Sequence, residues 1–271
     1  MSTRLARAAA LALTVLTAVQ PAAAQTGVTD GVVSARILPG WRTEAGTHMA
    51  GLEITLAPGW KTYWRAPGDA GIPPEFFWQH SQNVSGLRLH WPVPEVSHAN
   101  GMRSIGYSEH VVIPLEFTTP EGGRDAMIAG EVEIGVCADI CIPVRLPIVA
   151  ELPPQGSRSA EIVAALVDRP STAAEAGAGP LTCRVTPAAE GLRLEIALTL
   201  PPTGGAEEVV IEAGDPSIWV SEPVMRRDGD RLLATAELFD MDGTGGVALD
   251  RSRVRMTVLG TERAVDLLGC D

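Results

Sequence analysis

The chain has 271 residues, with 33 acidic residues against 21 basic ones and a formal net charge of −12. A surface this acidic argues against nucleic acid and against anionic lipid as partners. The cysteine count of four is even, which would allow two disulfides in an oxidising compartment.

Residues 1–24 have the pattern of a secretory signal peptide. Arg4 and Arg7 precede an apolar run from about Ala8 to Val19, and small residues end at Ala24. The apolar run is shorter than the roughly 20 residues that a membrane-spanning helix needs. We therefore predict cleavage after Ala24, export to the periplasm and no membrane insertion of the mature chain, in a compartment where disulfides persist.

Residues 26–153 are a succession of short strand patterns, among them "AGLEITLAPGW", "HVVIPLEFTTPEGG" and "GEVEIGVC". Proline, glycine and asparagine interrupt these runs every ten residues or so. Regularly spaced short strands with turn residues between them favour a β-sandwich or barrel over a helical fold.

Residues 154–180 are predicted to form a helix and a linker. Within 157–169 the period changes to that of a helix with four apolar residues on one face: Ile162, Val163, Leu166 and Val167. Ser159 can cap its start and Pro170 stops it. The following stretch, "PSTAAEAGAGP" (170–180), consists of small residues and is predicted to be a flexible linker.

Residues 181–271 return to strand patterns and are predicted to form a second sandwich. In "LRLEIALTL" one face of the predicted strand is apolar throughout: Leu192, Leu194, Ile196, Leu198 and Leu200. The segment "RVRMTVL" repeats this alternation near the end of the chain.

The cysteines divide naturally into Cys183 with Cys270 and Cys137 with Cys141. By the chain-entropy relation, a loop of nearly ninety residues contributes roughly 4–5 kcal/mol of stability and a ring of about five only about 2 kcal/mol. The long bridge is therefore expected to be structural. The short one, in "GVCADICIPV", calls for a reason other than stability.

Alternation predicts that both sulfurs of the short pair point away from the sandwich core. Val132, Ile134 and Val136 share one face of their strand, which places Cys137 on the other face. In the next strand the same alternation places Cys141 on the face that does not carry Val144. Residues 138–140 are short enough for a three-residue hairpin loop. Flanking residues would then face each other at a distance that a disulfide can span, near an exposed tip where an external thiolate can attack.

Three other interpretations of the short pair remain open. A structural zinc site would need a second closely spaced pair of ligands, and the sequence has none. Copper could be bound by a thiolate together with three dispersed residues: His98, Met102 and His110. The pair could also be an inert clip. Asp139, between the sulfurs, disfavours the thiolate, so under the exchange hypothesis we expect a relay of electrons from a stronger donor.

Three blocks in chain order resemble a known family: "APGWKTYWRAPGDAGIPPEF" (57–76), "SIGYSEHVVIPLEF" (104–117) and "GVCADICIP" (135–143). They are similar to the N-terminal periplasmic domain of the thiol:disulfide interchange protein DsbD, and more so to its relatives of the suppressor-of-copper-sensitivity type, ScsB. The resemblance covers about 28–152 well and the second half loosely. It implies an all-β protein of two immunoglobulin-like β-sandwich domains, joined by a short helix and linker.

The same resemblance implies roles for individual residues. Cys137 and Cys141 match the active pair, with Cys141 joining partners in the mixed disulfide and Cys137 resolving it. Residues 104–109 match a cap loop that shields the pair, with Ile105 and Tyr107 as the covering side chains. The implied activity is that of a protein-disulfide reductase component that needs no cofactor and binds no metal, because the cysteine pair itself carries two electrons.

The implied partners are a membrane-embedded thiol relay and periplasmic thioredoxin-like or other disulfide-containing proteins. Full-length family members carry a membrane domain and often a thioredoxin-like domain, neither of which is found up to Asp271. We therefore expect the electron source to be another polypeptide. The competing hypothesis is a non-catalytic periplasmic binding or chaperone-like module, linked to copper stress, whose hairpin disulfide stays oxidised.

Overall fold

The computed structural model describes residues 31–69, 71–99, 101–243 and 246–271. The predicted signal peptide, residues 1–24, lies outside the described residues. Within them, none of the helices has the length and apolar character required to span a membrane. Residues Gly31–Asp271 cluster as one compact unit.

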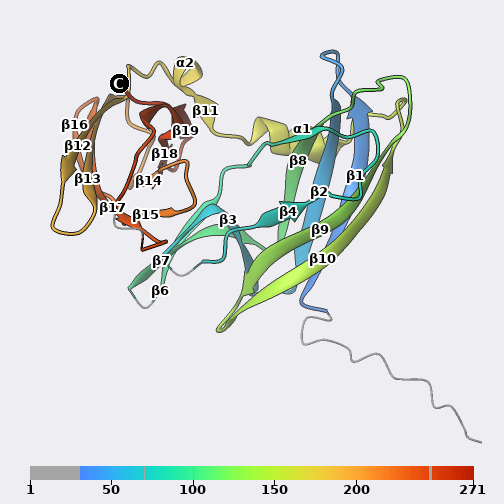
Figure 1. The fold of residues 1–271 in the computed structure, drawn as a ribbon, viewed down its shortest axis with the longest axis horizontal. Coiled ribbons are helices and arrows are strands. Elements are labelled where there is room, and N and C mark those ends of the chain that lie inside the picture. Colours follow the sequence, from blue (N-terminus) through green and yellow to red (C-terminus); the bar gives the residue numbers. More distant parts are fainter. Residues whose placement is uncertain (1–30, 70, 100, 244–245) are drawn as a thin grey trace, which may run out of the picture. The chain divides into compact units, whose positions relative to one another are not determined.

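Ten strands between residues 33 and 152 form two antiparallel sheets, drawn from blue to green in Figure 1. The first has the order β1-β2-β8-β5: β1 Val33–Arg42, β2 His48–Leu56, β8 His110–Thr118 and β5 Gly86–Leu89. The second has the order β10-β9-β3-β7-β6, with β4 also on β9: β10 Cys141–Leu152, β9 Ala126–Cys137, β3 Lys61–Gly68, β7 Met102–Ser108, β6 Glu95–Ala99 and β4 Glu75–Phe77.

The second half of the chain forms two further sheets. One has the order β11-β19-β18-β14: β11 Ser171–Thr172, β19 Ala264–Leu268, β18 Arg255–Leu259 and β14 Glu208–Glu212. The other has the order β12-β13-β17-β15, with β16 also on β17: β12 Thr182–Pro187, β13 Leu192–Thr199, β17 Arg231–Asp240, β15 Ile218–Val220 and β16 Val224–Asp228. The chain is therefore an all-β protein of immunoglobulin-like sandwiches, as predicted.

Each pair of sheets encloses an apolar core to which alternate residues contribute. In the first core, Ile54 of β2 and Leu115 of β8 meet Trp64 of β3 and Ile134 of β9 from the opposite sheet, all of them at most 1% exposed. In the second, the predicted alternation along β13 is confirmed for four residues that are at most 2% exposed: Leu194, Ile196, Leu198 and Leu200.

The predicted helix is present as α1, Ala160–Val167, and the hydroxyl of Ser159 accepts a hydrogen bond from the amide of Ile162. Its buried residues, Ile162 and Ala165, pack against strands of the first sandwich. The prediction of a featureless linker over 170–180 is wrong. This stretch holds β11 and a second helix, α2, Ala173–Ala176, which is fixed by a capping box at its N-terminus. A short 3-10 helix, η1, spans Arg251–Arg253.

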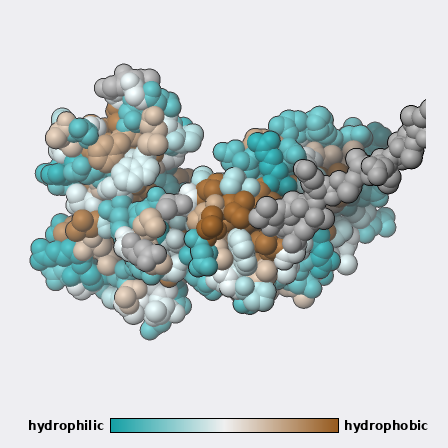
Figure 2. All heavy atoms as spheres, turned by 90° about the horizontal axis from the view of Figure 1, so that it is seen from below, coloured by the Kyte–Doolittle hydropathy of each residue, from teal (hydrophilic) through white to brown (hydrophobic). Residues whose placement is uncertain are grey.

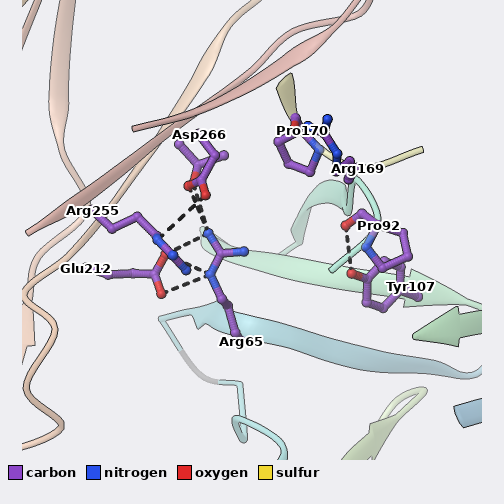
Figure 3. A network of polar contacts seen from close by, with 9 residues as sticks. Arg65, Pro92, Tyr107, Arg169, Pro170, Glu212, Arg255 and Asp266 are labelled. Atoms are coloured by element: carbon purple, nitrogen blue, oxygen red, sulfur yellow. Dashed lines mark hydrogen bonds and ion pairs between the residues drawn. The ribbon is translucent and has the colours of Figure 1, made fainter. Parts of the chain in front are cut away.

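The two sandwiches share apolar and charged contacts. Val210, Leu259 and Ala264 of the second half belong to the same buried cluster as the core of the first. Beside them, the guanidinium of Arg65 on β3 donates to both carboxylate oxygens of Glu212 at 3.1 and 3.0 Å. It also donates to Asp266 at 3.2 Å, so one arginine of the first sandwich binds two strands of the second (Figure 3).

Candidate redox site

The cysteine pair lies at the end of the β9–β10 hairpin, the longest strand pairing of the first sandwich. These strands pair residue by residue from Leu152 opposite Ala126 to Cys141 opposite Cys137. Only residues 138–140 remain for the loop, as predicted, and the amide of Ala138 approaches the carbonyl of Ile140 at 3.4 Å. The directly opposed cysteines are bridged, with their Cα atoms 4.1 Å apart.

The two sulfur-bearing residues differ in accessibility. Cys141 is exposed, whereas Cys137 is only 7% exposed. Neither belongs to an apolar core cluster, which agrees with the predicted face, but that face is covered at Cys137. Ile140, at the tip of the loop, is 72% exposed. The hairpin ends at the lower side of Figure 1, and Figure 2 shows apolar residues gathered on that face.

Side chains from β3 and the segment that follows it pack on β9 two residues before Cys137. Gly135 lies on the same face as Cys137, and a Cβ atom there would be 2.7 Å from the Cβ of Ile72 and 2.8 Å from the ring of Tyr63. Only glycine therefore allows these two side chains to pack so closely on β9. Because they lie beside Cys137, solvent reaches the pair mainly through Cys141.

Tyr63 also contacts the disulfide itself. Its hydroxyl lies 3.0 Å from Sγ of Cys141. The side chain is buried, and burial raises the pKa of Tyr63, so the phenol stays protonated and can donate to sulfur. The sequence analysis missed this residue, although its place between the inward-facing Thr62 and Trp64 puts it on the outer face of β3.

Lys61 provides a positive charge on the same face. In the pairing of β3 with β9 it lies directly opposite Cys137, and opposed residues of neighbouring strands have Cβ atoms about 4.5–5.5 Å apart. Its ammonium group donates to Ser97 at 3.4 Å. Ser97 lies on β6, on the other side of β3 from β9, so the ammonium group points away from the cysteine pair.

Ile105 and Tyr107 do not cover the cysteine pair, and that prediction is corrected. They lie in β7 and face the core: Ile105 is fully buried, and the hydroxyl of Tyr107 donates to the carbonyl of Pro92 at 2.9 Å (Figure 3). In the strand register Tyr107 is opposite Thr62, which is itself opposite the core residue Val136. Both side chains are therefore on the far side of the sheet from the sulfurs.

The other two cysteines are joined within the second sandwich. Cys183 on β12 is bridged to Cys270 over a separation of 87 residues, with Cα atoms 5.6 Å apart. Cys270 is 9% exposed and belongs to the second core. The amide of Cys183 also donates to the carbonyl of Asp271 at 2.8 Å. This bridge ties the first strand of that sheet to the final residues of the chain.

Among the described residues, one group brings three possible metal ligands within 4.8 Å of one another: His98, Glu208 and Glu222. Arg103 lies beside them, with Nη1 3.4 Å from Glu208 and Nε 3.8 Å from Glu222. Because Arg103 already pairs with both carboxylates, these residues do not fit a metal site. Of the residues named in the copper alternative, His110 pairs with Glu53 at 3.1 Å.

The fold and the bridged hairpin define a class: immunoglobulin-like sandwiches that carry a cysteine pair at a strand end. Residues 18–153 match the family model described as the thiol:disulfide interchange protein DsbD, N-terminal. The chain belongs to this family.

A similar solved structure is the N-terminal periplasmic domain of ScsB from Proteus mirabilis. It aligns with a TM-score of 0.63 and 22% sequence identity, over 88% of this chain and 92% of that chain. At this identity the likeness concerns the fold, and it extends over both sandwiches. No match was found among curated proteins.

Proposed function

We propose that the protein is a periplasmic thiol–disulfide interchange protein that relays electrons through Cys137 and Cys141. The observation that carries this proposal is the unequal burial of a bridged pair at a hairpin end, with Cys141 open to solvent and Cys137 covered. An external thiolate has access to one sulfur of the bridge, and the second sulfur is held within bonding distance of the first. Family membership supports the same chemistry.

The exchange proceeds in two displacements. A thiolate of the electron donor attacks Sγ of Cys141, the Cys137–Cys141 bond breaks, and Cys137 leaves with the electron pair and takes up a proton. A second thiolate of the donor then attacks the donor's own sulfur in the mixed disulfide and releases Cys141. The donor is left as a disulfide and this protein as a dithiol, so two electrons have passed.

Delivery reverses these steps on an oxidised protein. The thiolate of Cys141 attacks the target disulfide, and Cys137 then attacks Cys141 to restore the bridge and release the target as a dithiol. Tyr63 acts as a positioning residue, because its hydroxyl can donate a hydrogen bond to the sulfur of Cys141 during both displacements. The donor we propose is a membrane-embedded thiol relay, and the acceptors are periplasmic thioredoxin-like or other disulfide-containing proteins.

Trapping in the periplasm tests this function. Cys137→Ser removes the resolving sulfur and leaves the exposed Cys141, so mixed disulfides with other proteins should accumulate and disappear on reduction. The matched control is Cys141→Ser, which leaves only the covered Cys137 and should trap far less. Absence of adducts on Cys137→Ser, or equal trapping by both variants, would favour a binding module whose hairpin bridge remains closed.

A further inference from the structure

A hollow of about 600 Å³ lies between the two sandwiches. Residues at the end of β3 and after it, together with β7, form one wall, and β14, β15 and the turns that flank β15 form the other. Its volume is within the range of sites that bind small molecules or peptide segments. None of the steps proposed above uses it.

The aromatic ring of Tyr63 lies between the hollow and the redox site. Gly71 lines it, and a Cβ atom at Gly71 would be 2.8 Å from the ring of Tyr63. The hydroxyl of that same ring is 3.0 Å from Sγ of Cys141. A polypeptide joined to Cys141 therefore has its neighbouring residues within reach of the hollow.

The charges of the hollow favour a cationic occupant. Asp69 and Glu222 are exposed carboxylates of the lining, and Arg103 is its one cationic lining residue among those described. The guanidinium of Arg103 lies 3.4 Å from Glu208 and 3.8 Å from Glu222, whereas Asp69 accepts a hydrogen bond at 2.8 Å only from the neutral backbone amide of Arg103. Two carboxylates pair with the one guanidinium and Asp69 adds a third negative charge, so the net field is negative and would attract a lysine or arginine side chain.

The wall from the second sandwich provides apolar and backbone contacts. Trp219 on β15 is 41% exposed and Met241 is 64% exposed, both unusually accessible for large apolar side chains. β15 is the last strand of its sheet and pairs only with β17 among the described strands. An edge strand offers unpaired backbone groups to an extended peptide, with side-chain pockets giving specificity.

We propose that the hollow binds the segment that flanks the reactive cysteine of an exchange partner, and that it selects segments carrying a lysine or arginine beside an apolar residue. The cation lies between Asp69 and Glu222, and the apolar side chain packs on Trp219. The second sandwich thereby selects the partner for a sulfur on the first. This inference rests on the proposed exchange at Cys141.

The test uses the full chain with Cys137→Ser and short peptides whose single cysteine is activated as a mixed disulfide with thionitrobenzoate. The thiolate of Cys141 attacks the peptide sulfur, a protein–peptide disulfide forms, and thionitrobenzoate leaves with the electron pair and is measured by its absorbance. At low salt, a peptide with Lys-Leu flanks should react about five- to tenfold faster than one with Glu-Leu flanks. Added salt should reduce that ratio.

Two variants locate the preference. Glu222→Gln should reduce the ratio between the Lys and Glu peptides, and Trp219→Ala should remove the advantage of Leu over Gly beside the lysine. Glu190→Gln, an exposed carboxylate outside the lining, is the matched control and should leave both unchanged.

The activated disulfide of free cysteine separates the two proposals. If Cys141 does not react with this small probe, exchange at Cys141 is refuted. If all variants react with it equally and no peptide preference exists, or if Glu190→Gln reduces the preference as much as Glu222→Gln does, docking in the hollow is refuted and the exchange function stands.

Discussion

Under the proposed exchange, we expect the contact between Tyr63 and Cys141 to raise the reactivity of the exposed sulfur. In the Cys137→Ser background, Tyr63→Phe removes the phenol that lies 3.0 Å from Sγ of Cys141. A hydrogen bond to a charged group contributes about 1.5–3 kcal/mol, and the lower end applies because Cys141 is exposed. A loss of about 1.4 kcal/mol lowers the fraction of Cys141 present as thiolate about tenfold.

The remaining thiolate becomes more reactive, which offsets part of this loss. With a Brønsted coefficient of about 0.4–0.5, a tenfold loss of thiolate is accompanied by a gain of about threefold in nucleophilicity. Alkylation of Cys141 by iodoacetamide, followed by mass spectrometry near neutral pH, should therefore slow by about threefold in Tyr63→Phe.

Tyr107→Phe is the matched control, because the hydroxyl of Tyr107 binds the carbonyl of Pro92 on the opposite side of the sheet. It should leave the alkylation rate unchanged. Equal rates with and without the Tyr63 hydroxyl, in chains with the same circular dichroism spectrum, would refute the assignment of Tyr63. A slower rate in Tyr107→Phe would restore Tyr107 as a covering residue.

Three further predictions concern stability, measured by urea unfolding. Replacing Cys183 and Cys270 by serine should cost about 4–5 kcal/mol, against about 2 kcal/mol for the hairpin pair, because the longer loop restricts the unfolded chain more; equal losses would contradict this reasoning. Arg65→Met leaves Glu212 without its cation and Asp266 with Arg255 alone, and should cost about 2–3 kcal/mol, whereas Arg193→Met, at an exposed ion pair, should cost less than about 1 kcal/mol. Burial lowers the pKa of His48 from its usual 6.5, so below that pH the unfolded chain binds a proton that the folded chain does not. The free energy of unfolding should therefore fall as the pH drops below about 6.5. His48→Gln should weaken that dependence on pH.

Strand alternation predicted which face each cysteine occupies, but not what covers that face. The inward positions of Val132, Ile134 and Val136 are buried, as expected. Tyr63 and Ile72, which pack on β9 beside Gly135, lie some seventy positions earlier in the chain. A period-two pattern contains no information about such distant packing.

Two errors have a local origin in the sequence. Ile105 and Tyr107 alternate with Gly106, which is the pattern of a strand with an inward face, and only the family resemblance places them in a cap loop. In 170–180, Thr172 and Glu175 have the spacing of a capping box, and Gly177 follows at the C-terminus of the helix with φ of 66°. The small residues around Thr172 and Glu175 favour a linker prediction, although these two residues indicate a helix.

Three consecutive residues of β3 contact three different parts of the protein. Tyr63 contacts the sulfur of Cys141, Trp64 packs in the first core, and Arg65 binds the second sandwich. A one-residue insertion or deletion upstream in this strand would exchange all three roles at once, since each side chain would move to the opposite face. A change in the length of β3 would therefore disturb the contact with the sulfur and the attachment of the second sandwich together.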